Sequence, residues 1–265
     1  MIDVIIPAYN CSKTLGRTLA SLVAQTDSEF IVTIVDDCST EDIKTIVDEY
    51  SNRLNILYVK NEKNLGCGMT RQTGIDNTTC SHFTFLDSDD MFMPYAIEIF
   101  NSIVKANPNA EFIHSYIYEQ KMIEGNPALT LHKDGFSYCH GKLYSRKKVN
   151  EFGIKNSPLV KWHDDSYFNS MCAELMNMQL VSIPTVMWCC NQESITRKVD
   201  QFRDEKIVED FLSAMVMSKE FVLKYKTSVE HIPYTIDAVM SKLNGRQLTE
   251  NEKQLLDKLK EGDSK

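Results

Sequence analysis

Short apolar runs that stop at polar clusters recur along the first part of this chain, and they constrain its fold more than any other feature. The runs with the apolar, β-branched composition of buried strands are residues 3–6, 30–35, 56–59 and 82–86. Between them, apolar residues at helical spacing, such as Leu15, Leu19 and Leu22, predict amphipathic helices. Because strands alternate with helices, we expect an α/β fold with a doubly wound, mostly parallel sheet.

The alternation weakens beyond residue 120. Residues 111–118 indicate one more strand, whereas residues 119–140 are rich in turn formers and have no clear assignment. Asp164 is expected to begin a buried helix, and the pattern after Phe202 is helical. We therefore expect an α/β domain over residues 1–198 and a C-terminal helical extension over residues 199–265.

Composition excludes several classes of protein. A net charge of -8 and a pI near 5.3 disfavour bulk electrostatic capture of nucleic acid or of an anionic membrane. No apolar run approaches the roughly 20 residues of a membrane span, and the first residues lack the pattern of a signal peptide. The eight cysteines include no C-x-x-C pair, so free thiols are expected rather than a zinc site. We expect a cytoplasmic protein without a membrane span.

Three polar clusters follow predicted strands directly. They are Pro7-Ala8-Tyr9-Asn10, Asp36-Asp37 and Asp87-Ser88-Asp89-Asp90. Ligands of open α/β sheets bind beyond the carboxyl ends of the strands. The clusters are therefore expected to converge in a single site at one edge of the sheet.

The cluster Asp87-Ser88-Asp89-Asp90 carries the most specific chemistry. Carboxylates two residues apart on a tight loop can hold a hard cation beside a diphosphate, and Mg²⁺ and Mn²⁺ favour such oxygen ligands. The alternative is a solvated acidic turn, since aspartate and serine are common in turns.

Three other segments have both a functional and a structural interpretation. Asp36-Asp37 could bind a nucleobase or ribose, or cap the next helix together with Ser39. Two glycines precede the expected start of a helix, and Arg71 lies one turn into that helix. At this position its side chain could face a phosphate. Asp164-Asp165 begins the later helix, whose dipole keeps a carboxylate ionised, as a general base requires, although capping would also explain the pair.

These segments resemble the family 2 glycosyltransferases, which have the GT-A fold. The matching segments, in the order of the family, are residues 4–10, 34–40, 64–66, 71–75, 85–90, 141–144, 163–165 and 194–196. The resemblance implies inverting transfer of one sugar from a nucleotide-sugar donor, usually a UDP-sugar, to an acceptor hydroxyl, with Mn²⁺ or Mg²⁺ as the cofactor.

The resemblance also implies roles for individual residues. Asp165 would be the general base and Asp164 its neighbour, whereas Asp89 would be the principal metal ligand, with Asp87 contributing. The residues that would bind the nucleotide sugar are Pro7, Ala8, Tyr9, Asp36, Asp37, Asn64, Arg71, Asp87, Ser88, Ser194 and Thr196.

Two features depart from the family pattern. Cys38 stands where the family usually has glycine, so that turn must tolerate a side chain or adopt another geometry. The arginine and histidine that often precede the "SIT" segment are absent.

The rival interpretations are a nucleotidyltransferase, which would need a phosphate loop near the N-terminus, and a non-catalytic binding protein on the same fold.

The acceptor is suggested only by one basic stretch before the expected base. It contains Lys142, Arg146, Lys147 and Lys148. A solvated surface is the ordinary explanation, because lysine and arginine are normally exposed. The alternative is an anionic acceptor in a nearby cleft, such as a phosphate-rich glycopolymer or modified DNA.

Overall fold

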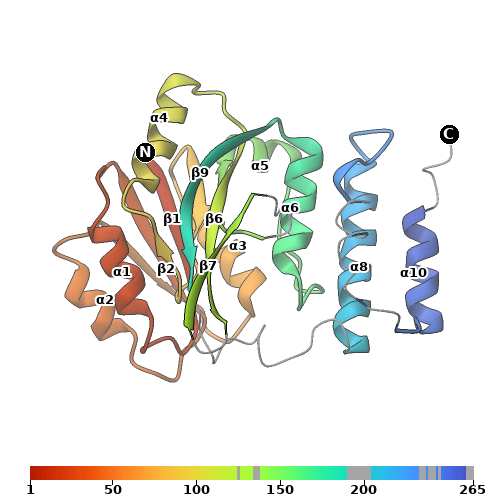
Figure 1. Ribbon diagram of the computed structural model, residues 1–265, viewed down its shortest axis with the longest axis horizontal. Helices are drawn as coiled ribbons and strands as arrows, with labels where there is room; N and C mark the ends of the chain where they lie inside the picture. The colour runs from red at the N-terminus through yellow and green to blue at the C-terminus, as the bar shows by residue number, and fades with distance from the viewer. Residues whose placement is uncertain are drawn as a thin grey trace.

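The computed structural model describes residues 1–123, 126–133, 138–189, 204–232, 237, 243 and 246–260. Within these ranges, one sheet contains strands in the order β3-β2-β1-β4-β8-β6-β9-β5, and β7 pairs with β6 outside this path (Figure 1). The strands are β1 Ile2–Ala8, β2 Phe30–Asp36, β3 Ile56–Lys60, β4 His82–Phe85, β5 Met91–Phe92, β6 Phe112–Ile123, β7 Asn126–His132, β8 Lys142–Ser145 and β9 Met178–Trp188. The helices are α1 Leu15–Val23, α2 Lys44–Tyr50, α3 Cys67–Asn77, α4 Ala96–Ala106, α5 Arg146–Phe152, α6 Asp164–Leu175, α8 Glu205–Val222 and α10 Glu250–Lys260. Among the described residues, no helix is both long enough and apolar enough to span a membrane.

The first half of the sheet is parallel, as the sequence predicts. β1 lies between β2 and β4 and pairs with both in the parallel sense, and β3 extends the sheet beside β2. The polar clusters after β1, β2 and β4 therefore meet at the carboxyl edge of the sheet.

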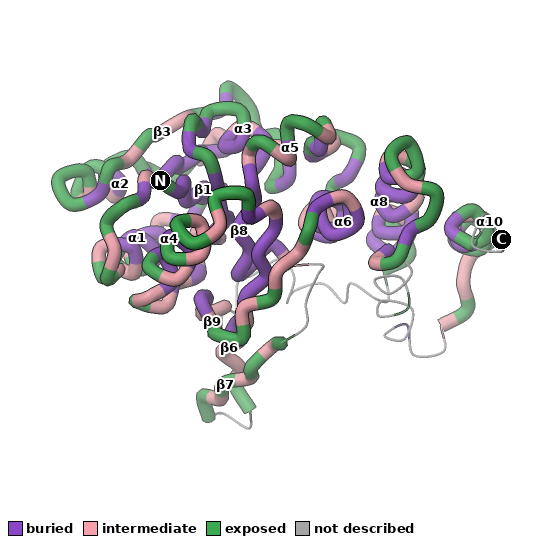
Figure 2. Tube along the Cα trace, turned by 90° about the horizontal axis from the view of Figure 1, so that it is seen from above, coloured by how far each residue is buried: buried purple, intermediate pink, exposed green. Residues whose placement is uncertain are grey.

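The second half of the sheet is mixed. β8 is antiparallel to both β4 and β6, β9 is parallel to β6, and β5 is antiparallel to β9. The turn-rich region after residue 119 contains the rest of β6 and the antiparallel strand β7, which extends away from the body of the molecule (Figure 2). The apolar residues Leu129 and Leu131 of β7 are exposed, so this strand lacks the buried run that identified the others.

Each face of the sheet has its own hydrophobic core, because successive side chains of a strand point to opposite faces. Val4 and Ile6 of β1 pack in the core that includes side chains of α1 and α4. Ile5 lies in the other core, which includes Phe83 and Phe85 of β4 and side chains of α6 and α8.

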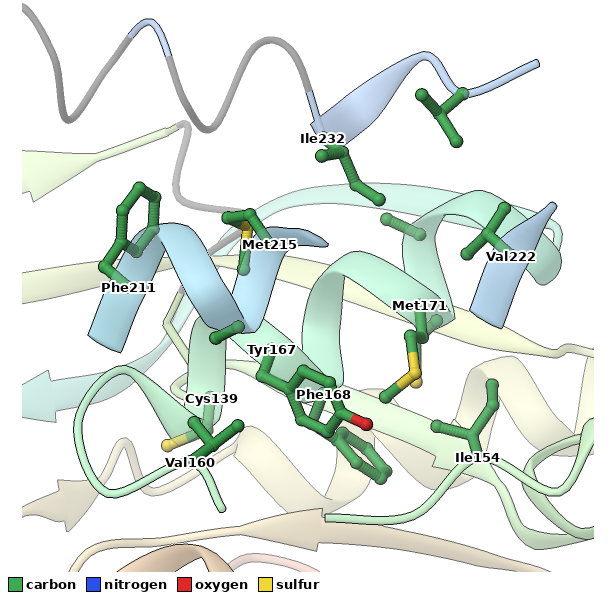
Figure 3. Close-up of a cluster of buried hydrophobic side chains, with 14 of the residues drawn as sticks. Cys139, Ile154, Val160, Tyr167, Phe168, Met171, Phe211, Met215, Val222 and Ile232 are labelled. Atoms are coloured by element: carbon green, nitrogen blue, oxygen red, sulfur yellow. The ribbon is translucent and has the colours of Figure 1, made fainter. Parts of the chain in front are cut away.

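The C-terminal helices continue this second core. Tyr167, Phe168 and Met171 of α6 lie close to Phe211 and Met215 of α8 in one cluster (Figure 3). α10 packs on the far side of α8 (Figure 1). The expected boundary between residues 198 and 199 lies outside the described residues, and the division into a domain and an extension stays a prediction.

A buried carboxylate also connects α6 to the chain that follows α8. Glu174 Oε1 accepts hydrogen bonds from the backbone N–H groups of Glu230, His231 and Ile232, at 2.7, 2.6 and 3.1 Å. Its other oxygen lies 3.2 Å from Lys226 Nζ. Glu174 therefore satisfies backbone donors that the helical extension would otherwise bury.

The start of α2 differs from the capping arrangement expected at Ser39. The Ser39 hydroxyl accepts a hydrogen bond from the Asn10 N–H at 3.0 Å instead. Asp42 supplies the side-chain acceptor for the helix, since its carboxylate accepts from the Thr45 N–H at 3.2 Å.

Candidate active site

The polar clusters after β1, β2 and β4 line one cavity of about 640 Å³ at the carboxyl edge of the sheet. The predicted site residues in its lining are Pro7, Ala8, Tyr9, Asp37, Asn64, Asp87, Ser88 and Asp89. Its remaining wall comes from residues after β1 and from the start of α3, among them Lys13, Gly66 and Thr70. The structure therefore brings most of the three predicted clusters together at one edge of the sheet.

Asp37 fixes the loop that forms one wall of the cavity. Its Oδ1 accepts from Asn61 Nδ2 and from the Leu65 N–H, both at 2.8 Å, and its Oδ2 accepts from the Gly66 N–H at 2.9 Å. Asn64 Nδ2 donates to the carbonyl of Asp37 at 3.4 Å. Asp37 therefore shapes the wall as well as lining it.

Asp36 lies behind the lining. Its carboxylate accepts from the Tyr58 hydroxyl at 2.6 Å and from the Ser39 N–H at 2.7 Å. It is almost fully buried, so the structure does not bring it to the cavity surface with Asp37.

The turn after β2 accommodates Cys38 in the left-handed backbone region, with φ of 61°. Its thiol contacts the Glu62 carbonyl at 3.7 Å. Of the two outcomes expected for this departure from glycine, the structure shows a turn that tolerates the side chain. Asn10, which lines the cavity, also has a positive φ, and its side chain accepts from the Thr40 N–H at 2.9 Å.

Arg71 joins two acidic segments that are far apart in the sequence. From α3, its Nη2 donates to Asp87 Oδ1 at 2.7 Å and its Nη1 donates to Asp164 Oδ2 at 2.5 Å. The guanidinium is buried and lies 5.7 Å from the centre of the Phe85 ring. Arg71, predicted to contact the nucleotide, is not among the residues that line the cavity, and it instead links Asp164 to the loop after β4.

The Asp87 carboxyl group is ionised although it is partly buried. Burial opposes its charge, but the nearby Arg71 and His140 outweigh that effect and hold the pKa of Asp87 below its usual range.

Asp165 has the opposite character. Burial, followed by repulsion from Asp164, raises the pKa of Asp165 to about 6. One carboxylate oxygen accepts from the Ser166 N–H at 2.8 Å. A carboxyl group with this pKa is ionised at neutral pH and is a stronger base than an ordinary aspartate, so it suits proton abstraction.

The sequence-based reasoning did not identify His140, and it gave Asp90 no role of its own within the acidic cluster. Asp90 Oδ2 lies 2.6 Å from His140 Nε2, and Asp90 Oδ1 accepts from the Cys189 N–H at 2.8 Å. The imidazole of His140 stacks on Trp188 with 5.4 Å between ring centres. Asp90 adjoins the predicted metal ligands, but nothing in the sequence indicates that a histidine 50 residues away is its partner.

The acidic residues of the cavity fit a hard divalent cation. Asp87 and Asp89 both line it, and the Asp89 carbonyl accepts from Arg17 Nη2 at 2.5 Å, which fixes the loop backbone. Ligand atoms of Asp87, Cys139 and His140 also lie within 4.8 Å of one another. Burial raises the pKa of the Cys139 thiol well above its usual value, which disfavours the thiolate form that binds metals. Because Mg²⁺ and Mn²⁺ prefer oxygen, the carboxylates of Asp87 and Asp89 are the fitting pair.

The basic stretch does not form the surface expected for an anionic acceptor. Lys142 is fully buried and donates to the Tyr138 carbonyl. Arg146 donates to the Cys80 carbonyl at 2.8 Å, and Lys148 pairs with Glu111 at 3.3 Å. Arg146 and Lys148 are thus engaged by groups of the protein where β8, antiparallel to β4, ends. An anionic acceptor at this stretch stays a prediction.

The pairing of Ser145 with His82, the first residue of β4, carries the residues that follow β8 to the opposite edge of the sheet. Lys147 lies on that side and, together with Arg146 and Lys148, lines a separate cavity there. Ser194 and Thr196, expected to contact the donor, lie outside the described residues.

A family model described as glycosyl transferase family 2 matches residues 3–176. The chain belongs to this family. An uncharacterised glycosyltransferase of Haemophilus influenzae is 38% identical over 114 residues, which cover 43% of this chain and 38% of that protein. Chondroitin synthase of Escherichia coli is 36% identical over 100 residues, which cover 37% of this chain and 14% of that protein. The aligned part of this family 2 chain thus spans well under half the length of both relatives.

The fold is the GT-A fold of solved glycosyltransferases. TarS of S. aureus, residues 1–349 in complex with UDP, superposes with a TM-score of 0.70 over 92% of this chain and 71% of that chain, at 20% identity. The mannosyltransferase PcManGT of Pyrobaculum calidifontis, in complex with GDP-Man and Mn²⁺, gives a TM-score of 0.62 over 97% of this chain and 72% of that chain, at 13% identity.

Proposed function

We propose that this family 2 chain is a metal-dependent, inverting glycosyltransferase that moves one sugar from a UDP-sugar to an acceptor hydroxyl. The observation that carries the proposal is the position of Arg71 between Asp87 and Asp164. Through this one guanidinium, the start of α6, which supplies Asp165, is held beside the loop that supplies the metal ligands. A base at Asp165 and a leaving-group site at Asp89 would thereby lie at the same edge of the sheet.

The cavity lining supports donor binding. Pro7, Ala8 and Tyr9 would frame the nucleoside, and the half-exposed ring of Tyr9 offers a flat apolar surface for a base. Asp37 and Asn64 would line the ribose side, whereas Asp36 would act through Tyr58 and Ser39 from behind. Ser88 and Asp87 would face the diphosphate, and Ser194 and Thr196 remain proposed donor contacts.

Asp165 would remove the proton of the acceptor hydroxyl. As that proton moves to the carboxylate, the acceptor oxygen forms a bond to the anomeric carbon, and the bond from this carbon to the diphosphate oxygen breaks. Its electron pair leaves with the diphosphate, so a single displacement inverts the configuration. Asp164 would orient the acceptor or the sugar while it is held by Arg71. A bound Mn²⁺ or Mg²⁺, held by Asp89 and Asp87, supplies Lewis-acid stabilisation of the charge on the diphosphate.

The structural neighbours support UDP as the nucleotide and a divalent cation as the cofactor. The TarS complex contains UDP, and a further TarS structure contains UDP-GlcNAc. The archaeal mannosyltransferase contains GDP-Man, so GDP-sugars are the first alternative, and its Mn²⁺ matches the cation proposed for Asp89. Among the described residues that line the cavity, Lys13 is the one lysine or arginine, so the lining supports an uncharged acceptor better than a polyanionic one.

The test is nucleotide release from a panel of UDP-, GDP- and TDP-sugars, with Mn²⁺ or with EDTA. We expect turnover of one UDP-sugar that EDTA abolishes, and loss of that turnover in Asp89→Ala and Asp165→Asn. Asp48→Asn, at an exposed ion pair of α2, serves as the matched control and should be fully active. If no sugar nucleotide is turned over, or if EDTA has no effect on turnover, the proposed reaction or its metal dependence is wrong.

A further inference from the structure

We propose that His140 is a positioning residue that fixes the carboxylate of Asp87, and that Asp90 and Trp188 hold His140 in place for this role. This inference rests on the proposed function, since it concerns the diphosphate side of the same site. His140 was not among the residues that the sequence pattern indicated.

Both oxygens of the Asp87 carboxylate face a nitrogen-bearing side chain. Oδ1 accepts from Arg71 Nη2 at 2.7 Å, and Oδ2 lies 3.5 Å from His140 Nε2. Oδ1 is therefore hydrogen-bonded, whereas Oδ2 has a longer, electrostatic contact with an imidazole whose Nε2 is hydrogen-bonded to Asp90. This contact favours the orientation of the Asp87 carboxylate in which Oδ2 lies on the His140 side.

The imidazole of His140 is itself held from two directions. Its Nε2 lies 2.6 Å from Asp90 Oδ2, and its ring is nearly parallel to that of Trp188, with 23° between the ring planes. All three side chains come from separate segments, since Asp90 ends the acidic loop, His140 precedes β8 and Trp188 ends β9. The ring orientation is therefore a product of the fold.

Asp90 anchors this arrangement to the sheet. Its Oδ1 accepts from the Cys189 N–H at 2.8 Å, its carbonyl accepts from the Thr18 hydroxyl at 2.8 Å, and its own N–H donates to the Asp87 carbonyl at 3.0 Å. Residues that orient the ligands of a metal or diphosphate site act through such hydrogen bonds. Without the imidazole, the buried Asp90 Oδ2 would lose its partner, and the Asp87 carboxylate would keep Arg71 alone.

The experiment compares His140→Leu with His140→Gln in the full chain. Leucine removes the polar contact, whereas the glutamine Nε2 can donate to Asp90. We expect the leucine variant to lose about 10- to 100-fold in kcat with the preferred sugar nucleotide, since partners of this kind typically contribute that much. The glutamine variant should recover most of the loss. His82→Leu is the matched control, because His82 is equally buried but contacts the Ala110 carbonyl at the opposite edge of the sheet.

Hydrogen exchange of backbone amides provides a second readout that needs no turnover. In His140→Leu, the amide of Cys189 and those of residues 87–90 should exchange faster than in wild type, while His82→Leu leaves them unchanged. An unaltered kcat in His140→Leu, or equal impairment of both His140 variants, would overturn the inference. If wild type turns over no donor, the proposed function fails. In that case hydrogen exchange of the backbone amides is the remaining test of the role of His140. Equal exchange rates in wild type and His140→Leu would overturn the inference.

Discussion

A Cβ atom added to Gly68 would lie 2.8 Å from the Cβ atom of Asp164. The first turn of α3 thus approaches the start of α6 so closely that only glycine fits. Arg71, one turn further along α3, reaches Asp164 across this contact.

We predict that Gly68→Ala impairs turnover more than stability. The methyl group would push Asp164 away from Arg71 and shift Asp165 with it. A displacement of this kind in the reacting groups costs on the order of 100-fold in rate. Steady-state kinetics and thermal melting of the variant would test this.

The matched control for this change is Gly74→Ala in the same helix. A Cβ there would meet Ile5 Cγ2 at 2.3 Å, in the core and away from the acidic residues. It should lower the melting temperature with little effect on kcat per folded molecule. A Gly68→Ala enzyme with wild-type kcat would show that the approach of the two helices has no part in the reaction.

The pH dependence of turnover should reveal Asp165. Because its pKa is raised from the ordinary 3.8 to about 6, the base is protonated below that pH and ionised above it. We expect kcat to rise with pH through about 6 and Asp165→Asn to lose about 100- to 10,000-fold in rate at pH 7.5. A wild-type profile whose acid limb lies near pH 4 would contradict the assignment.

The same shift predicts an effect on stability. A carboxyl group whose folded pKa is raised stabilises the folded state below its unfolded pKa, and that contribution is lost as the pH rises through the folded value. Asp165→Asn should therefore melt at a higher temperature than wild type at pH 8. Near pH 4 the two proteins should melt at similar temperatures. Scanning calorimetry without metal at both pH values would measure the difference.

Cys38 offers a test of backbone strain. A non-glycine residue in the left-handed region costs about 1–2 kcal/mol, whereas glycine loses about 0.5–1 kcal/mol of extra entropy on folding. Cys38→Gly should therefore change the free energy of unfolding by less than about 1 kcal/mol. Cys38→Val should destabilise the protein clearly, because a β-branched residue fits this region poorly. Urea unfolding that shows equal stability for the two variants would refute the argument.

Glu174 should be essential to the attachment of the helical extension. Its replacement by alanine leaves three backbone N–H groups without this acceptor, and that of Ile232 is buried, so we expect a cost of about 1–3 kcal/mol. Glu174→Gln keeps an acceptor oxygen and should lose less. Glu151→Ala, at an exposed position of α5, is the control and should unfold like wild type in urea. Equal losses for the two Glu174 variants would show that charge, rather than the acceptor, is what the site requires.

The sequence predicted the parallel half of the sheet and the place of the site because both follow from local patterns. Each of β1, β2 and β4 is a buried run next to its own polar cluster, so the topology rule alone brings Tyr9, Asp37 and Asp87 together. The roles of Arg71 and His140 depend instead on partners 93 and 50 residues away, respectively. No periodicity encodes such contacts.

Lys142 was misjudged for a related reason. Its charge and its basic neighbours suggested an exposed side chain. Its position in β8 instead places it in the centre of the sheet, where its ammonium group donates hydrogen bonds to backbone carbonyls. β7 and β9 were missed because both are partly exposed strands that depend on β6 for their pairing.

The pairing of β5 with β9 has a consequence for folding during synthesis on the ribosome. Met91 and Phe92 leave the acidic loop and pair with Met187 and Val186, and the hydrogen bond from the Cys189 N–H to Asp90 joins residues 99 positions apart. Contacts of such long sequence separation form slowly, because the intervening chain must first be ordered. The acidic loop therefore emerges early in synthesis but acquires its final shape only after β9 has been translated.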